Sequence, residues 1–294
     1  MNQFIEFEGI SFTVKREDLL HPVISGNKYR KMKYNVMQAI YQEKRTLLTF
    51  GGAYSNHIAA VAEAGKEFGF KTTGIIRGEE LKDKIAENPT LSYAQECGMH
   101  FEFVSRQAYR KKKEAFYLDK LQRDYDDCYI LPEGGTNTLA IKGCEEILTD
   151  DDRQFDTICV PVGTGGTIAG LINSAADHQK IRGFSALKGS FLIDEVKSLT
   201  TKRENWQIQT DYHFGGYGKI NADLITFINQ FKARTGIPLD PIYTGKMVYG
   251  IVDLFKKKYL KKEEKILVIH TGGLQGIEGI NRKLKRQKRT LIER

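Results

Sequence analysis

Short apolar runs alternate with segments of helical spacing along most of the chain. In the first half, the residues between two such runs place apolar side chains three or four positions apart, which is typical of helices that pack on one face. The pattern predicts strands at 46–50, 71–77, 99–104 and 128–132, and helices at 58–68, 89–97 and 112–125. Four strands that alternate with helices indicate a small parallel sheet covered on both faces.

The second half repeats this alternation. A helix is predicted at 138–148, and strands are predicted at 157–162, 181–187, 206–212 and 265–270. This series predicts a second parallel sheet. The fold class is therefore α/β, with two open, mostly parallel twisted sheets and helices on both faces.

The first 44 residues belong with the second series. The stretch 4–16 contains an alternating, strand-like pattern, and 30–43 has helical spacing. The apolar face of that helix is expected to carry Met32, Val36 and Ile40. Because the strand at 265–270 lies far along the chain while these residues begin it, we expect the N-terminal segment to pack on the larger sheet. The predicted domains are a large one, 1–44 plus 136–294, and a small inserted one, 45–135.

The composition is that of a globular protein. Of the 294 residues, 40% are hydrophobic and 28% are charged, which excludes disordered and fibrous classes. No apolar run is long enough to span a bilayer, and the N-terminus lacks the basic and then apolar pattern of a signal peptide. We therefore expect a cytoplasmic protein with no membrane partner.

Cysteines and surface charge add little chemistry. The cysteines are widely spaced, and no histidine stands at a metal-binding interval from them. We expect no metal, and reduced, mostly buried thiols at Cys97, Cys128, Cys144 and Cys159. The net charge of +8 comes largely from basic runs at 110–113, 256–265 and 282–289. These runs are helix-like or terminal, with acids mixed in and no regular aromatic interleaving, so nucleic-acid binding is disfavoured.

Lys28 is the first candidate for chemistry. It follows the small residues of 25–27 and stands near the start of a predicted helix. The helix dipole disfavours a cation there and helps to keep the amine nucleophilic. A lysine whose pKa is lowered by its surroundings can form a Schiff base with a carbonyl compound. The alternative is a solvated surface charge, which is the ordinary state of a lysine.

A turn rich in glycine and threonine follows the strand at 157–162. Its residues are Gly163, Thr164, Gly165, Gly166 and Thr167. Glycines free the backbone and threonine hydroxyls add donors, as in phosphate-binding loops. No lysine followed by Ser or Thr completes a Walker A loop, and Ile168 stands where a dinucleotide-binding turn needs its last glycine. A phosphorylated cofactor other than ATP or NAD fits better; the alternative is a tight turn that needs glycine for packing.

Two further groups of residues could face a ligand. Ser55, Asn56 and His57 form a polar cluster at a predicted helix N-terminus, where Ser55 can serve as a helix cap or as a catalytic hydroxyl. Tyr217 and Tyr243 are flanked by glycine turns, which favours a cleft over the usual core or interface position of tyrosine. No zinc-protease motif or G-x-S-x-G elbow is present, so hydrolases of those types are poorly supported.

Taken together and in order, these motifs resemble the pyridoxal-phosphate enzymes of the 1-aminocyclopropane-1-carboxylate deaminase and D-cysteine desulfhydrase family, of the tryptophan synthase β fold type. The match runs over nearly the whole chain and comprises 15–18, 25–31, 51–57, 163–167, Tyr217, 240–246 and 269–273. The resemblance implies pyridoxal-phosphate fold type II, with the cofactor in the cleft between two domains, a small amino-acid substrate, and a homodimer.

The resemblance also implies roles for individual residues. Lys28 would bind pyridoxal 5'-phosphate as a Schiff base and would then be freed to take a proton from the substrate Cα. Asn56 would hold the ring hydroxyl of the cofactor, and Lys31 with 163–167 would hold its phosphate. The substrate carboxylate would be received by Ser55, Asn56 and His57, and the reacting carbon would lie close to Tyr217 and Tyr243.

Two threonines bear on the choice between the activities of this family. Aminocyclopropanecarboxylate deaminases resemble one another in having glutamate and leucine where this chain has Thr244 and Thr271. A carboxylate beside the ring nitrogen of the cofactor keeps it protonated, as opening an unactivated cyclopropane demands, and threonine does so less well. We therefore expect β-elimination of D-cysteine. The alternatives are aminocyclopropanecarboxylate deamination and turnover of D-serine or another β-substituted D-amino acid.

Some features depart from the family or suit other functions. Tyr54 stands where many relatives have glutamine, and the chain is shorter than typical members, which concerns the substrate more than the fold. A basic nucleic-acid-binding protein would use the lysine runs and leave the glycine turns unexplained; salt-dependent retention on DNA would support it. A cofactor carrier without turnover would keep Lys28 but would not need Ser55 or the two tyrosines, and an inert Tyr243→Phe change would favour it.

Overall fold

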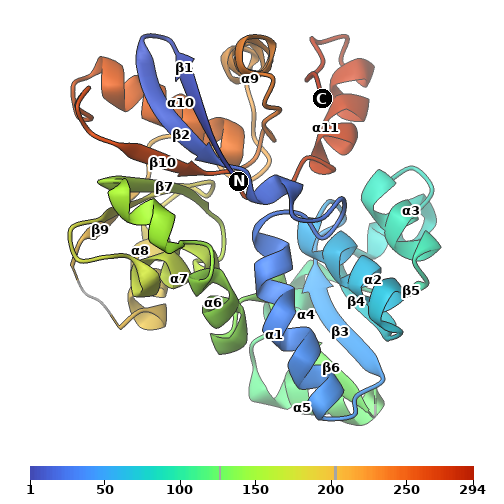
Figure 1. The fold of residues 1–294 in the computed structure, drawn as a ribbon. Coiled ribbons are helices and arrows are strands. Elements are labelled where there is room, and N and C mark those ends of the chain that lie inside the picture. The colour runs from blue at the N-terminus through green and yellow to red at the C-terminus, as the bar shows by residue number, and fades with distance from the viewer. Residues whose placement is uncertain (126, 202–203) are drawn as a thin grey trace.

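The computed structural model describes residues 1–125, 127–201 and 204–294. These residues form two separate sheets with helices packed around them (Figure 1). The predicted α/β class with two mostly parallel sheets is confirmed. Within the described residues, no helix combines the length and the apolar character that crossing a membrane requires.

The larger sheet has six strands and is parallel except at one edge. Its order is β1 (Asn2–Phe7), β2 (Ile10–Lys15), β10 (Ile266–Ile269), β7 (Thr157–Val162), β8 (Lys180–Ser185) and β9 (Trp206–Gln209). β1 and β2 form an antiparallel hairpin whose turn, Glu8 and Gly9, has positive φ at both residues. β2 pairs in parallel with β10. The N-terminal segment therefore packs on the larger sheet, as predicted.

The smaller sheet is wholly parallel. Its order is β5 (Met99–Val104), β4 (Lys71–Arg77), β3 (Thr46–Gly51) and β6 (Cys128–Leu131). The helices between these strands are α2 (Asn56–Phe68), α3 (Pro89–Glu96), α4 (Arg106–Arg110) and α5 (Ala115–Asp124). Successive residues of β3 are buried, because helices cover the sheet on both faces.

The remaining helices surround the larger sheet and join it to the smaller one. They are α1 (Asn27–Tyr41), α6 (Thr138–Glu145), α7 (Gly166–Ser174), α8 (Phe191–Leu199), α9 (Ala222–Thr235), α10 (Thr244–Lys256) and α11 (Gly276–Arg286). α1 packs against both α6 and α2 and so lies between the two sheets (Figure 1). α11 reaches α3, where Arg282 donates to the Glu87 carbonyl at 2.9 Å. We propose a large domain, 1–44 plus 136–294, and a small domain, 45–135, each built around one sheet.

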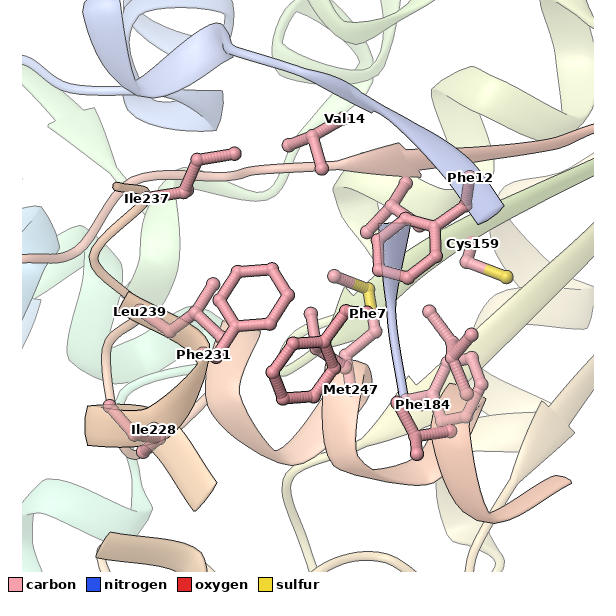
Figure 2. Packing of buried hydrophobic residues seen from close by; sticks show 14 of the residues in the cluster. Phe7, Phe12, Val14, Cys159, Phe184, Ile228, Phe231, Ile237, Leu239 and Met247 are labelled. Atoms are coloured by element: carbon pink, nitrogen blue, oxygen red, sulfur yellow. The ribbon is translucent and has the colours of Figure 1, made fainter. Parts of the chain in front are cut away.

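The larger sheet is buried on both faces, and Figure 2 shows the core on one of them. The hairpin residues Phe7 and Phe12 meet Phe231 of α9 and Met247 of α10 there. The ring centroids of Phe7 and Phe231 are 5.0 Å apart, in an edge contact favourable for aromatic pairs. Cys159 of β7 belongs to this core, whereas its neighbours in the strand belong to the core on the opposite face. The apolar hairpin is thus held by α9 and α10.

Several predicted details are corrected by the structure. The helix predicted at 30–43 begins at Asn27, so Lys28 lies in its first turn. Ile40 is exposed, because steps of four residues drift away from the 3.6-residue period, and Ala39 takes its place on the buried face. The helix predicted at 112–125 begins only at Ala115 as α5, and a separate short helix, α4, precedes it; the strand predicted at 206–212 ends at Gln209. The cysteines are reduced thiols and three of the four are buried, as predicted.

Candidate active site

Strands of both sheets end at one cavity of about 500 Å³. Among the residues that line it, Gly52 follows β3, Arg77 ends β4, Gly163 follows β7 and Thr271 follows β10. The carboxyl ends of parallel strands are where α/β proteins bind ligands, because the loops after them converge there. The cavity between the two sheets is therefore the candidate active site.

The N-terminus of α1 brings Lys28 and Lys31 to this cavity. Both side-chain amines donate to the backbone oxygen of Gly134, at 3.2 Å from Lys28 and 2.9 Å from Lys31. The start of the helix is fixed by Gly26, which has a φ of 61°. A Cβ added at Gly26 would lie 2.1 Å from the backbone oxygen of Thr271, so only glycine fits. α1 is thus docked directly on the segment that follows β10.

The two lysines differ from surface lysines in their protonation. Burial, and then the positive charge of Lys31, lower the pKa of the Lys28 amine well below its ordinary value. Burial also lowers the pKa of Lys31. A neutral amine is the nucleophilic form of lysine. The sequence predicted a lowered pKa for Lys28 from its position near the helix N-terminus. Burial and the charge of Lys31 are two further causes, and both depend on the tertiary structure.

The glycine- and threonine-rich turn forms the next wall. Gly163, Thr164, Gly165 and Thr167 line the cavity at the N-terminus of α7. Lys31 donates to Thr164 Oγ1 at 3.4 Å, and Asn27 donates to Thr167 Oγ1 at 2.8 Å. A helix N-terminus, two hydroxyls and a lysine make an anion site of the kind that binds phosphate. Gly166 does not line the cavity.

Gly166 has a packing role instead. A Cβ there would lie 2.9 Å from Thr136 Oγ1 and 3.2 Å from the Lys31 amine. Lys31 also donates to Thr136 Oγ1 at 2.9 Å. The missing side chain at 166 therefore leaves room for the lysine to reach the turn.

The polar cluster at the start of α2 is only partly directed at the cavity. Ser55 Oγ accepts the backbone N–H groups of His57 and Ile58, so Ser55 is the helix cap, and Ser55 and Asn56 also line the cavity. His57 borders it as well, but its buried imidazole lies 2.9 Å from Thr49 Oγ1. Burial, followed by the charges of Lys28 and Lys31, lowers the pKa of His57 and keeps it neutral. The His57 side chain is thus already engaged within the smaller sheet.

Tyr217 and Tyr243 meet across the cavity wall. Their ring centroids are 6.2 Å apart with an interplanar angle of 64°. Tyr243 lies at the start of α10, where Gly163 leaves its ring space: a Cβ at Gly163 would be 3.0 Å from the ring. Burial, with the nearby Tyr217 and Asp240, raises the pKa of Tyr243 well above its ordinary value. Its phenol therefore stays protonated and can act as a donor.

The two threonines that bear on the activity lie in different surroundings. Thr271 lines the cavity, whereas Thr244 does not. The buried Thr244 hydroxyl donates to Asp240 Oδ1 at 2.8 Å. The other carboxylate oxygen of Asp240 accepts the N–H groups of Ile242 and Tyr243, both at 2.9 Å. Thr244 is thus committed to the turn that starts α10, which the sequence alone does not reveal.

The sequence analysis missed several residues that line the cavity. They are Ser25, Asn27, Arg77, Glu133, Gly134 and Gln275. The signal for two of them was present, because Arg77 ends a predicted strand and Glu133 directly follows one. Ser25 and Asn27 lie just before Lys28 in the sequence. The direction of their side chains depends on where the helix begins, which the sequence did not give. Gln275 follows the last glycine turn and carried no signal of its own.

A model of the pyridoxal-phosphate dependent enzyme family matches residues 2–272. The chain belongs to this family. A putative 1-aminocyclopropane-1-carboxylate deaminase of Pyrococcus horikoshii is 35% identical over 290 residues, which cover 91% of this chain and 86% of that protein. The mitochondrial bifunctional D-cysteine desulfhydrase/1-aminocyclopropane-1-carboxylate deaminase of Arabidopsis thaliana is 30% identical over an alignment of 297 positions, which covers 92% of this chain and 74% of that protein.

The fold agrees with this membership. The crystal structure of an aminocyclopropanecarboxylate deaminase homologue superposes with a TM-score of 0.81 at 30% identity, covering 95% of this chain and 89% of that one. The protein is thus a pyridoxal-phosphate-dependent enzyme related to aminocyclopropanecarboxylate deaminases and D-cysteine desulfhydrases.

The residues of the cavity fit pyridoxal phosphate. The cofactor aldehyde requires a neutral amine, and the lowered pKa of the half-buried Lys28 favours that form at the cavity wall. The cofactor phosphate requires donors and positive charge, which the N-terminus of α7 and Lys31 offer together. Gly163 keeps clear the space that a side chain would fill beside Tyr243. Amine and anion site thus line one cavity.

Proposed function

We propose that this enzyme cleaves and deaminates a small amino acid, and that its reaction is the β-elimination of D-cysteine to pyruvate, sulfide and ammonia. Pyridoxal phosphate supplies the aldehyde that captures the substrate amine and the ring that withdraws electrons from Cα. The observation that carries the proposal is the half-buried Lys28 amine, whose pKa is lowered, in one cavity with Tyr217 and Tyr243. Nucleophile, base and proton donors are then within one site.

In this proposal, the start of α2 binds the substrate carboxylate. The positive end of the helix dipole favours an anion, and Ser55 and Asn56 line the cavity there. The Ser55 oxygen caps the helix, so its hydroxyl hydrogen is free to be donated to the carboxylate. His57 belongs to this site only as part of the helix N-terminus, because its imidazole is hydrogen-bonded to Thr49.

Lys28 and the tyrosines handle the protons. The Lys28 amine, whose lowered pKa favours its neutral form, would accept the Cα proton. Tyr243 keeps its proton and donates a hydrogen bond near the reacting carbons, with Tyr217 beside it.

The choice of D-cysteine rests on the threonines at 244 and 271. Neither provides a carboxylate to the cofactor ring, and the buried Asp240 carboxylate is bonded to Thr244 and to backbone N–H groups. A thiolate leaves without the strong electron withdrawal that opening a cyclopropane requires. The family resemblance further suggests a homodimer, which light scattering of the purified protein would test.

Deamination of aminocyclopropanecarboxylate to 2-oxobutyrate is the second candidate. The Pyrococcus horikoshii relative carries that name, and the Arabidopsis thaliana relative carries both. The test is to follow the visible absorbance of the cofactor-loaded enzyme on addition of each substrate and to measure sulfide, pyruvate and 2-oxobutyrate. Sulfide and pyruvate from D-cysteine at a much higher rate support the proposal. Equal or faster ring opening would overturn it in favour of the second candidate.

A further inference from the structure

Arg77 is a cationic residue of the cavity with no role in the site described so far. It ends β4, beside the end of β3, and its side chain lines the cavity. A Cβ added at Gly52 would lie 3.5 Å from one guanidinium nitrogen, so the group lies over the turn that precedes Ser55. The guanidinium is therefore held on the side of the cavity formed by the smaller sheet.

The charge of Arg77 is not neutralised by the protein. Across residues 1–125, 127–201 and 204–294, no carboxylate forms an ion pair with it. Its packing partner is the ring of Tyr109, with the guanidinium carbon 5.7 Å from the ring centroid. An arginine that faces a cavity without an acidic partner is available to an anionic ligand.

The nearby carboxylate is already engaged elsewhere. Glu133 also lines the cavity, but its Oε1 accepts from the Tyr109 hydroxyl at 2.7 Å and its Oε2 lies 3.3 Å from the Lys112 amine. Tyr109 thus touches both Arg77 and Glu133. Counting Arg77, Lys112 and Glu133, this corner of the cavity carries one uncompensated positive charge.

Tyr217, assigned to the reacting carbon, lines the same cavity as Arg77 and Glu133. Burial raises the pKa of Tyr217, and the positive charge of Arg77 opposes that shift. The proposed carboxylate site lies at Ser55 and Asn56, at the start of α2. The positive corner is therefore suited to the other end of a bound amino acid, its side chain.

We propose that Arg77 binds an anionic group at the β-position of the substrate. The inference rests on the proposed function and refines it: the preferred substrates are amino acids whose β-substituent already carries a negative charge when it binds. A thiolate belongs to this class, whereas the ring of aminocyclopropanecarboxylate and the chlorine of β-chloroalanine are uncharged. Arg77 would thus determine the preference among substrates. The negative charge of Glu133 would weaken the attraction of this corner for an anion.

Binding to the cofactor-loaded enzyme gives the first test. D-aspartate and D-asparagine share their shape and α-groups and differ in charge at the β-position, and neither needs to be turned over. Calorimetric titration should show tighter binding of D-aspartate to the wild type. Arg77→Gln should abolish the preference, with D-aspartate losing about tenfold or more, the size expected for a charge-assisted hydrogen bond. Glu133→Gln should increase the preference.

A matched control is Arg106→Gln. Arg106 is an arginine of the same region whose side chain pairs with Glu80 at 2.9 Å and does not line the cavity. This variant should keep the wild-type preference. If Arg77→Gln weakens both ligands equally, the guanidinium binds the shared α-carboxylate and the inference is wrong; if it weakens neither, the inference is also wrong.

Turnover gives the second test and separates this inference from the proposed function. S-sulfo-D-cysteine loses its Cα proton to the base, and its Cβ–S bond breaks with the electron pair leaving on thiosulfate; β-chloro-D-alanine loses chloride in the same way. Arg77→Gln should lower kcat/KM for the first about tenfold or more and for the second less than about threefold. If the wild type turns over neither compound, the proposed function fails, and the D-aspartate titration alone decides the role of Arg77.

Discussion

The amine of Lys28 and the amine of Lys31 share one acceptor, the backbone oxygen of Gly134, at 3.2 and 2.9 Å. Two buried cations so close together would repel each other strongly. The repulsion and the burial both favour a neutral Lys28, whose pKa is lowered well below its ordinary value. Lys31 thereby serves the proposed phosphate site and the reactive amine at the same time.

Replacing Lys28 should remove both cofactor attachment and proton abstraction. We expect Lys28→Ala to lower kcat by about 10³-fold or more, because a positioned base alone contributes about 10²- to 10⁴-fold. The visible absorbance of bound pyridoxal phosphate should shift or vanish in parallel. Lys33→Ala is the control: Lys33 lies on the same helix, and its amine pairs with Glu146 at 2.7 Å at the surface. Wild-type absorbance in Lys28→Ala would contradict the assignment.

Lys246 should position Tyr217 without touching the substrate. Its buried amine donates to the backbone oxygens of His213 at 2.8 Å and Gly216 at 2.9 Å, which fixes the loop that carries Tyr217. Lys246 is on α10, the helix whose N-cap is Tyr243, so one helix places both phenols. We expect Lys246→Met to lower kcat about tenfold with cofactor absorbance retained, and Lys246→Arg to recover part of the loss. An unchanged kcat in Lys246→Met would contradict this role.

The same lysine should make stability depend on pH. Burial lowers the pKa of Lys246 to about 8, against 10.5 for an unperturbed lysine, and the nearby Asp240 opposes the shift. Between pH 8 and 10.5 the unfolded chain binds more protons at this group than the folded one, so its contribution to stability rises with pH. The free energy of unfolding in urea should be measured for the wild type and for Lys246→Met. From pH 8 to 10.5, the difference between the two values should change in favour of the wild type. A constant difference would contradict the prediction.

Gly26 should tolerate no side chain. It has a φ of 61°, and an added Cβ would lie 2.1 Å from the backbone oxygen of Thr271. We expect Gly26→Ala to lower the free energy of unfolding by about 3 kcal/mol or more, since backbone atoms cannot move aside cheaply. Gly69→Ala is the matched control, with a φ of 78° and nothing within 4 Å, and should cost only about 1 kcal/mol. Equal losses would show that the contact with Thr271 does not matter.

Ser55→Ala should separate capping from substrate binding. Ser55 caps α2 by accepting two backbone N–H groups, and its loss should cost about 1 kcal/mol of stability. If Ser55 also binds the carboxylate, KM should rise about tenfold. Asn88 caps α3 in the same manner but does not line the cavity, so Asn88→Ala should cost similar stability with KM unchanged. A KM that stays constant in Ser55→Ala would leave the residue only its capping role.

The sequence by itself determined most of the strands and helices of this protein and indicated Lys28 as the candidate nucleophile. The alternation of apolar runs with helical spacing predicted both sheets, because burial on two faces leaves a local trace in the chain. Lys28 and the turn at 163–167 could also be predicted from the sequence. A glycine turn beside the start of a helix or the end of a strand is a local feature of the chain.

Tertiary structure decided which of these residues meet and in what state. Lys28 and Gly134 are 106 positions apart, and Lys246 and Gly216 are 30 apart, so only the packing of helices and loops brings them together. The burial that lowers the pKa of Lys28 likewise belongs to no single segment. Thr244 turned inward to Asp240 for the same reason: hydrogen-bond partners are chosen by the folded chain, and residue type limits them only in part.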